Sequence, residues 1–371
     1  MYVLGCHTAF RNTFSRWNLL ASSQIPTTTN YSFGIQYQLP GQFVLDTAYV
    51  GSVSRHQLDK LNLNAIPYGA TFAANTQDPT KGTGGTLGSQ ALDANFLRPF
   101  PGFGDISVHR TGSSSNYNSL QLGLNRQFSK GFLFGVSYTW GKALGVTSAD
   151  GDFVRIDNLM RAGRYGPLSF DRRHTFAANY IYDIPSFFKG HALAHAGLDG
   201  WQISGLTRFQ TGAPFTPGIS INGYNNQTIT GSYTEGFRAR VLCDPNTGSD
   251  DPYNRINAAC FAPALPGSIG VESGTNFLYG PGINDTDLSL QKSFQIKERM
   301  SIELRADAFN VFNHTQFSGY NTSLTFAGIT SNAITNGFLK ADGTINNLNG
   351  FGTVSGARDP RIMQLGMRVR F

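Results

Sequence analysis

The sequence predicts an all-β fold, an antiparallel transmembrane β-barrel segment of about ten strands. Two observations predict it: short segments alternate apolar with polar residues, and the connections between them alternate between short and long. Successive side chains of a strand point to opposite faces, so alternation gives one apolar and one polar face. Outer-membrane barrels show this pattern in segments of roughly 10 residues, with short turns at one end and long loops at the other.

The last segment of the chain alternates most regularly. One face carries five apolar residues and the other carries polar or small ones: Met363, Leu365, Met367, Val369 and Phe371 against Gln364, Gly366, Arg368 and Arg370. A barrel strand that ends the chain on an aromatic residue is typical of outer-membrane proteins. We therefore expect Met367, Val369 and Phe371 to form a carboxy-terminal assembly signal for the barrel-assembly machinery.

Eight earlier segments alternate in the same way, over residues 31–39, 43–53, 120–124, 132–140, 176–184, 201–209, 288–294 and 302–308. The short connections between the segments lie near 40–42, 129–131, 185–197 and 296–299, and the long ones near 54–115, 141–173, 212–283 and 313–360. With the carboxy-terminus in the periplasm, counting backwards puts every short connection on the periplasmic side. We assign residues 31–371 to the barrel and residues 1–30 to a poorly defined amino-terminal segment.

The composition is consistent with this fold. Charged residues make up 14% of the chain, against roughly 25% in typical soluble domains. Aromatic residues reach 13%, and the 43 glycines supply turns. Mean hydropathy is −0.22 and we find no apolar run of 18 residues, so transmembrane helices are not expected.

The sequence gives no support to several other functions. The net charge of +6 comes without a Lys/Arg cluster, so nucleic-acid binding is not expected. Nucleotide-binding, metalloprotease and hydrolase motifs are missing from the sequence, so we do not expect an enzyme or a cofactor. His191 and His195 have i,i+4 spacing, but they fall in a predicted turn, and a metal site is not expected there.

Cys243 and Cys260 lie in one polar segment rich in Pro and Asn. A disulfide between them suits an oxidising compartment, and the alternative is two unpaired thiols. Cys6 has no obvious partner. The Asn-, Thr- and Gly-rich loop at Asn222–Phe237 could bind sugar or peptide, although most such loops are simply solvated.

Charged residues give two candidate ligand sites. The first is the cluster Asp171, Arg172, Arg173 and His174, which either binds an anionic ligand at the outer rim or forms a salt-bridged strand entrance; we favour the second. The other is the set of polar-face residues Glu303, Arg305, Asp307, Arg368 and Arg370, which we expect to form a ladder of opposite charges in the barrel lumen. Such a ladder tunes permeation or holds a plug, or it is only a salt-bridge network.

Two cations, Arg126 and Lys292, interrupt apolar stripes. Both fall near the predicted periplasmic end of their strands. A charge there costs less than at the centre of the membrane, and a long side chain can extend toward water.

Six stretches in order resemble the carboxy-terminal barrel of TonB-dependent outer-membrane receptors of the Oar-like group. They are SNYNSLQLGL (115–124), GVSYTWGKAL (135–144), FDRRHTF (170–176), GWQISGLTRFQTGAP (200–214), RADAFNVFNHTQF (305–317) and ARDPRIMQLGMRVRF (357–371). The resemblance covers nearly the whole chain from about residue 31. It implies a barrel of about 22 strands and energy-coupled uptake of a bulky substrate.

The sequence departs from that group because we identify no plug, no TonB-contacting box and no regulatory module in it. About ten strands cannot close a wide barrel, so we expect the carboxy-terminal part of a longer protein, with a TonB-type protein acting through the missing amino-terminal parts. The alternatives are an outer-membrane structural or adhesion barrel that displays long loops and, more weakly, a secreted lectin-like sandwich.

Overall fold

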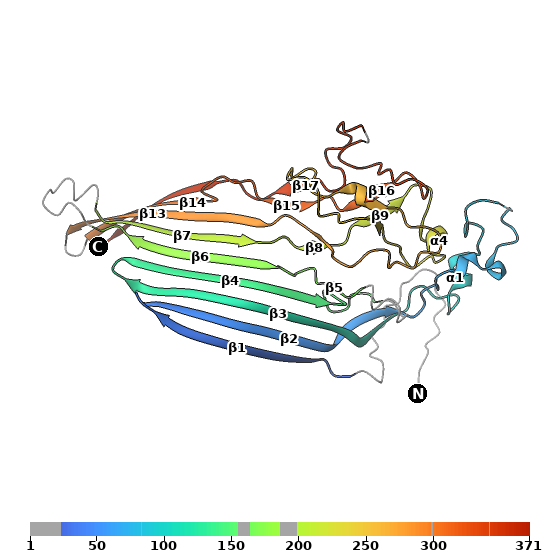
Figure 1. The fold of residues 1–371 in the computed structure, drawn as a ribbon, viewed down its shortest axis with the longest axis horizontal. Helices are drawn as coiled ribbons and strands as arrows, with labels where there is room; N and C mark the ends of the chain where they lie inside the picture. Colours follow the sequence, from blue (N-terminus) through green and yellow to red (C-terminus); the bar gives the residue numbers. More distant parts are fainter. Residues whose placement is uncertain (1–23, 83, 155–163, 186–198, 298–299, 341) are drawn as a thin grey trace.

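The computed structural model describes residues 24–82, 84–154, 164–185, 199–297, 300–340 and 342–371. They form one ten-stranded antiparallel sheet in which neighbours in the chain are mostly neighbours in space (Figure 1). Its strands, in spatial order, are β1 (Thr27–Leu39), β2 (Phe43–Asn62), β3 (Ser107–Ser129), β4 (Phe132–Gly145), β6 (His174–Asp183), β7 (Trp201–Gln210), β13 (Ile283–Lys297), β14 (Met300–Phe309) and β18 (Ile362–Arg370). The short β5 (Gly166–Pro167) pairs with the end of β4.

The described strands do not close into a barrel. Within them β1 pairs only with β2, and β18 pairs only with β14. Each of these edge strands therefore leaves one row of backbone N–H and C=O groups without a strand partner in the sheet. The predicted strand count and the predicted incomplete barrel are both confirmed.

All nine predicted alternating segments are strands, but β2 and β3 extend further than expected. The loop predicted over 54–115 is in fact 63–106, because the two strands continue to pair out to Asn62 and Ser107. Asp59, which is fully buried, accepts hydrogen bonds from Arg110 (2.9 Å) and from the Ser113 hydroxyl (2.8 Å) across the strand pair. Polar contacts of this kind join two strands but leave no alternating apolar pattern in the sequence. The extension of β2 and β3 was therefore not predicted.

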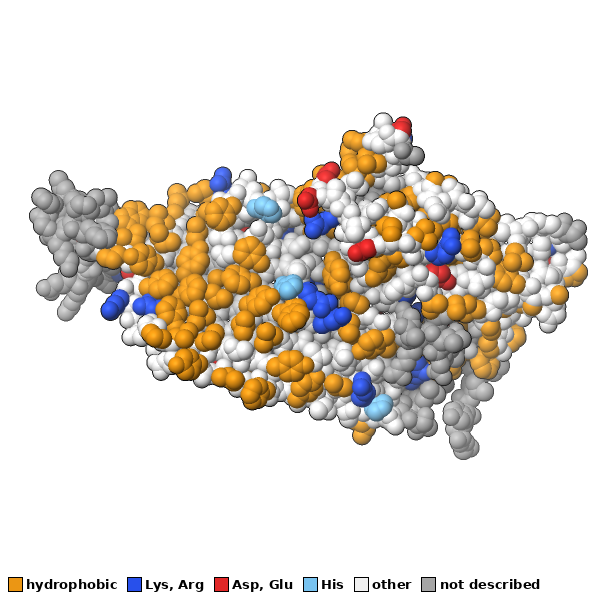
Figure 2. Space-filling model, viewed as in Figure 1, with side chains coloured by type: hydrophobic (Ala, Val, Ile, Leu, Met, Phe, Trp, Pro, Cys, Tyr) orange, Lys and Arg blue, Asp and Glu red, His pale blue; other side chains and the backbone are white. Residues whose placement is uncertain are grey.

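The sheet has one apolar face, and much of it is exposed. Leu365 is 82% exposed, Phe33 71% and Met367 70%. Figure 2 shows apolar side chains covering the strand region on the visible side, with few charges among them. A continuous apolar surface of this size is not expected to face water.

The connections sort by length between the two ends of the sheet, as predicted. The described tight turns at 40–42 and 130–131 lie at one end, and the segments 63–106, 146–173, 211–282 and 310–361 leave from the other (Figure 1). The predicted short connection at 185–197 lies almost wholly outside the described residues, with His191 and His195. Cys6 and most of the segment 1–30 lie outside them too; β1 begins at Thr27.

The long connections contain small elements of their own. Four two-stranded sheets pair β8 (Pro214–Phe215) with β12 (Leu278–Tyr279), β9 (Gly218–Ile221) with β16 (Ser323–Phe326), β10 (Arg240–Val241) with β11 (Phe261–Ala262), and β15 (Phe317–Tyr320) with β17 (Val354–Ala357). The helices of the described residues are α1 (Ala94–Leu97), α4 (Asn226–Ile229) and 3₁₀ turns at Ala70–Phe72, Ala74–Thr76 and Ala258–Cys260. None of the described helices is long and apolar enough to cross a membrane.

A cluster of buried hydrophobic residues lies in these connections. Segments 211–282 and 310–361 pack together around Ile221, Ile229, Ala239, Ile256, Phe261, Ala264, Leu278, Leu324, Phe326 and Phe351. The parallel pairing of β9 with β16 joins the two segments, and the Phe261 and Phe351 rings meet edge-on with centroids 5.4 Å apart. We call this packed unit the loop cap.

The loop cap changes the expectation for the loop at Asn222–Phe237. Ile229 and Ser232 are fully buried and Thr230 is 1% exposed, so this stretch is part of a packed unit and is not simply solvated. Its helix α4 begins with a capping box between the Asn225 and Thr228 side chains. Hydrogen bonds also join this stretch to the segment 63–106, which packs against it.

Candidate functional site

The polar face of the sheet carries a ladder of ion pairs. Arg370 of β18 contacts Glu303 of β14 at 3.1 Å, and Arg305 contacts Asp307 of the same strand at 2.8 Å. Glu303 lies opposite Arg368 in the strand register, although within the described residues those two side chains form no ion pair. The structure therefore brings all five predicted polar-face residues onto two adjacent strands.

The ladder continues onto residues that the sequence analysis did not select. Arg208 of β7 contacts Asp285 of β13 at 2.6 Å and reaches Asp287 at 4.0 Å. The register pairs Arg208 with Asp285 directly. Their positions in alternating segments could have identified them, because each lies on the polar side of its own strand.

The residues of the cluster Asp171–His174 differ in burial and in hydrogen-bond partners. Asp171 is 2% exposed and accepts a hydrogen bond from the backbone N–H of Ala143 at 2.6 Å, which holds the start of β6 against β4. Arg172 donates to backbone carbonyls, and His174 is exposed and shares a hydrogen bond of 2.8 Å with the Tyr138 hydroxyl. In the described residues no ion pair joins the members of the cluster, so the strand entrance is held by backbone hydrogen bonds and not by salt bridges.

The two cations on the apolar face are held by backbone carbonyls and aromatic rings. The Arg126 guanidinium donates to the carbonyls of Gly41 (3.1 Å), Ser129 (3.1 Å) and Phe132 (2.5 Å), which ties two short turns together. Lys292 is buried, donates to the Asp199 carbonyl and lies 4.9 Å from the Phe294 ring centroid. These contacts, which are not visible in the sequence, accommodate both charges.

A disulfide joins Cys243 to Cys260, with a Cα–Cα distance of 4.9 Å. It lies beside the β10–β11 pair in the loop cap. Glu272 supports the neighbouring stretch by accepting hydrogen bonds from the Ser268 hydroxyl and the backbone N–H groups of Arg238, Ile269 and Gly270. Burial raises the pKa of Glu272, but these hydrogen bonds outweigh it and hold the pKa below its ordinary value.

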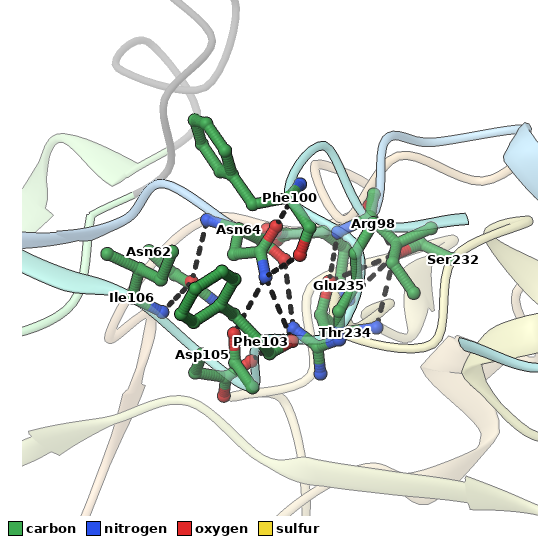
Figure 3. A network of polar contacts seen from close by, with 12 residues as sticks. Asn62, Asn64, Arg98, Phe100, Phe103, Asp105, Ile106, Ser232, Thr234 and Glu235 are labelled. Carbon is green, nitrogen blue, oxygen red and sulfur yellow. Dashed lines mark hydrogen bonds and ion pairs between the residues drawn. The ribbon is translucent and has the colours of Figure 1, made fainter. Parts of the chain in front are cut away.

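A polar network fixes the segment 63–106 against the loop cap (Figure 3). The Asn64 amide donates to the carbonyls of Phe100, Phe103 and Gly104 at 2.8 to 3.1 Å, and the Asn64 carbonyl oxygen accepts from the Phe100 N–H at 2.7 Å. The Ser232 hydroxyl donates to the Ile66 carbonyl at 2.6 Å. We call residues 96–104, the stretch held by Asn64, the Asn64 platform. Its phenylalanines point outward: Phe96 is 72% exposed, Phe100 50% and Phe103 59%.

A cavity of about 1290 Å³ opens where β4, β6, β7 and β13 meet the loop cap. Its sheet side contains Tyr138, His174, Phe176 and Phe209, and its loop side contains Asp250, Arg255, Tyr279, His314 and Tyr320. Arg173, which directly precedes β6, lines the sheet side as well. The sequence analysis selected Arg173 and His174 for this region but not Arg255.

The assembly residues lie on the edge strand. Met367 and Val369 project from the apolar face of β18, and Phe371 follows the strand and is 98% exposed. Their role as an assembly signal stays a prediction. In the described residues no group of three or more His, Cys, Asp or Glu side chains is placed to hold a metal ion.

Comparison with known proteins identifies the family. The family model of the outer membrane beta barrel domain matches residues 7–364, nearly the whole chain. The chain belongs to this family. The chain is therefore located in the bacterial outer membrane. In barrels of that membrane the apolar face of the strands contacts lipid and the polar face lines the lumen. No curated protein sequence matches the chain.

Solved structures similar to the chain include three outer-membrane proteins. They are the outer membrane transporter YddB of Escherichia coli (10% identity, TM-score 0.42), the pyoverdine receptor FpvA of Pseudomonas aeruginosa (13%, 0.40) and the siderophore receptor PiuA of Acinetobacter baumannii (9%, 0.40). The alignments cover 97%, 93% and 93% of this chain, and 35%, 30% and 28% of those proteins. The chain thus spans about a third of the length of these structures.

Proposed function

We propose that the chain is the carboxy-terminal barrel portion of a TonB-dependent outer-membrane receptor that takes up a bulky substrate. Support comes from the six ordered sequence stretches that resemble the Oar-like group and from membership of the outer membrane beta barrel domain family. Energy would come from a TonB-type protein acting on amino-terminal parts that lie outside this chain. The carboxy-terminal strand would enter the membrane through the barrel-assembly machinery.

The observation that carries the proposal is the loop cap. A pore for small solutes needs only a polar channel, whereas capture of a bulky ligand needs an ordered surface at the outer rim. Two long connections here share one hydrophobic core, and one of them is cross-linked by the Cys243–Cys260 disulfide. Burial of apolar side chains between the loops stabilises one conformation of such a surface.

The lumen ladder would act below the cap. Arg208, Asp285, Arg305 and Glu303 present alternating charge across β7, β13 and β14. A plug contributed by the rest of the protein could bind to these groups, and a polar substrate could pass along them. Toward the end of the ladder with the long connections, Asp285 and Asp287 share Arg208.

The proposal is tested by uptake in the organism that encodes the chain. Cells with the gene deleted, complemented, or carrying Arg208→Ala with Arg305→Ala are given a panel of labelled compounds too large for general porins. We expect at least one compound to lose uptake on deletion and on dissipation of the proton-motive force, and to lose most of it in the double variant. Uptake that persists without the proton-motive force would show a passive pore instead.

A second candidate function, adhesion, is favoured by the Asn64 platform. Its phenylalanines are exposed on a segment that hydrogen bonds hold rigid (Figure 3). Aromatic side chains on rigid supports are frequent in protein-binding surfaces. Phe96→Ser with Phe100→Ser would reduce cell attachment if adhesion is the function, and would leave energy-dependent uptake unchanged.

A further inference from the structure

The large cavity has an aromatic floor that belongs to the lipid-facing surface. The strand register pairs Tyr138 with Phe176 and Phe176 with Phe209, so the three side chains form one row across β4, β6 and β7. The Phe176 and Phe209 ring centroids are 5.6 Å apart. Below this row the same face continues as apolar stripes toward the short turns, which places the cavity where the outer leaflet begins.

Basic side chains surround this floor. Arg173 and Arg255 line the cavity and, in the described part of the chain, neither has an ion-pair partner. His174 and His314 also line it, and Asp250 is the one carboxylate among the described lining residues. The buried Asp171 carboxylate next to Arg173 is bonded to the Ala143 N–H. The lining therefore carries more positive than negative charge.

Arg255 comes from the loop cap and faces the sheet across the cavity. Its charge acts on the Tyr320 hydroxyl, another lining residue, where it opposes the rise in pKa that burial of Tyr320 causes. Arg173 directly precedes β6, on the sheet side of the cavity. The two guanidinium groups thus come from opposite walls of the cavity, an arrangement suited to an anion between them.

We propose that this cavity binds the phosphorylated headgroup of an acylated lipid of the outer leaflet. Guanidinium groups bind phosphate oxygens through paired, charge-assisted hydrogen bonds. The described lining contains two guanidinium groups and one carboxylate. The acyl chains lie on the row Tyr138, Phe176 and Phe209 and along the apolar stripes below. The aromatic floor continues into the membrane, where acyl chains can pack on it and a soluble anion cannot. The occupant that fits is therefore a lipid.

This site lies on the lipid-facing side, away from the lumen ladder. It rests on the outer-membrane location of the chain and on the loop cap lying outside the cell, and it does not depend on the uptake proposal. The loop cap overhangs it, so a bound lipid contacts both the sheet and the cap. The lipid is then a structural partner that holds the cap at the membrane surface.

The test is binding of defined lipids to the full chain in a non-ionic detergent. The probes are phosphorylated lipid A, the same lipid A with its phosphates removed, and inorganic phosphate, each measured by native mass spectrometry and by titration. The variant is Arg173→Gln with Arg255→Gln. The matched control is Arg55→Gln with Lys340→Gln, which removes two exposed cations that do not line the cavity.

We expect phosphorylated lipid A to bind the natural chain at least tenfold more tightly than the dephosphorylated form. The Arg173/Arg255 variant should lose that difference, and the control should keep it within about twofold. Retention of heat-modifiable migration on gels shows that each variant is folded. Equal binding of the two lipids, unchanged binding by the variant, or equally tight binding of inorganic phosphate would each overturn the proposal. Phosphate binding alone would mean a simple anion site.

A second measurement covers the case in which the double variant does not fold. Phe209→Ala leaves both arginines in place and removes part of the aromatic floor. It should weaken binding of phosphorylated lipid A and leave the weak binding of inorganic phosphate unchanged. If Phe209→Ala binds lipid A as well as the natural chain does, the acyl chains do not lie on this floor and the proposal is wrong.

Discussion

Arg126 and Lys292 place positive charge on the lipid-facing surface near the short turns. Arg126 donates to three backbone carbonyls and Lys292 to that of Asp199, and each lies against aromatic rings. At the end of the barrel a long cationic side chain can therefore act as a clamp between turns. Apolar periodicity predicted the strands that carry these two residues, but it could not predict the contacts, because they depend on how the turns fold and on carbonyls as distant in the sequence as those of Gly41 and Asp199.

Replacing Arg126 with methionine should destabilise the chain by about 1 to 3 kcal/mol. Three backbone carbonyls lose a charged donor, and the turns at 40–42 and 129–131 lose their cross-link. Urea unfolding in detergent micelles measures the change, with Lys130→Met, an exposed cation in one of the same turns, as the control. A midpoint equal to that of the control would show that the clamp contributes nothing.

Glu272 gives the loop cap a dependence on pH. The pKa of this carboxyl lies below its ordinary value of 4.5, because the folded loop donates hydrogen bonds to its charged form. A lowered pKa stabilises the folded state above pH 4.5, and that contribution is lost as the pH falls through the lower folded value.

Hydrogen exchange at the backbone N–H groups of Ile269 and Gly270 measures this effect. Protection of these groups, relative to Glu272→Gln at the same pH, should be greater at pH 6 and should converge with that of the variant toward pH 3. If the natural chain and the variant differ equally at both values, the carboxylate is not the source of the protection.

At the scale of elements, alternation located the nine long strands of the sheet but not the two-residue β5, and connection length located the two ends of the sheet. The prediction failed where strands are joined by polar groups: β2 and β3 run past residue 54 because Asp59 bridges them to Arg110 and Ser113. The loop cap was not predicted for a related reason. Its core residues come from segments far apart in the chain, and no local period marks Ile229, Phe261 and Phe351 as partners.

The residues of the candidate sites also differ in whether the sequence could assign them. Glu303, Arg305 and Asp307 could be assigned to the polar face from their alternation, since a strand has a period of two. Arg255 and the cavity around it could not be assigned, because its partners across the cavity lie on β4, β6 and β7. Loop residues of this kind are placed by tertiary packing, about which a single sequence carries little information.

The disulfide should stabilise one element of the cap without affecting the sheet. It closes a loop with a sequence separation of 17, for which about 3 kcal/mol is expected from restricting the unfolded chain. Cys243→Ser with Cys260→Ser should therefore speed proteolysis within 244–259, while the heat-modifiable migration of the barrel stays the same. Equal proteolysis of the natural and variant chains would mean that packing alone holds this loop.

At the scale of the whole molecule, the two faces of the sheet differ from each other, and so do its two ends. One face is apolar and exposed, and the other carries an ion-pair ladder. One end has tight turns, and the other carries loops that share a core (Figure 1). The orientation of these ends in the outer membrane is the central claim, since both the uptake proposal and the lipid site require the loop cap to lie outside the cell.

Labelling of single cysteines on intact cells tests this claim most directly. In a Cys6→Ser background, Asn332→Cys places a thiol in the long connection 310–361, and Ser129→Cys places one at a short turn. A membrane-impermeant maleimide should label Asn332→Cys on intact cells, and should label Ser129→Cys only after the outer membrane is permeabilised. Labelling of Ser129→Cys but not Asn332→Cys on intact cells would reverse the orientation and contradict the account.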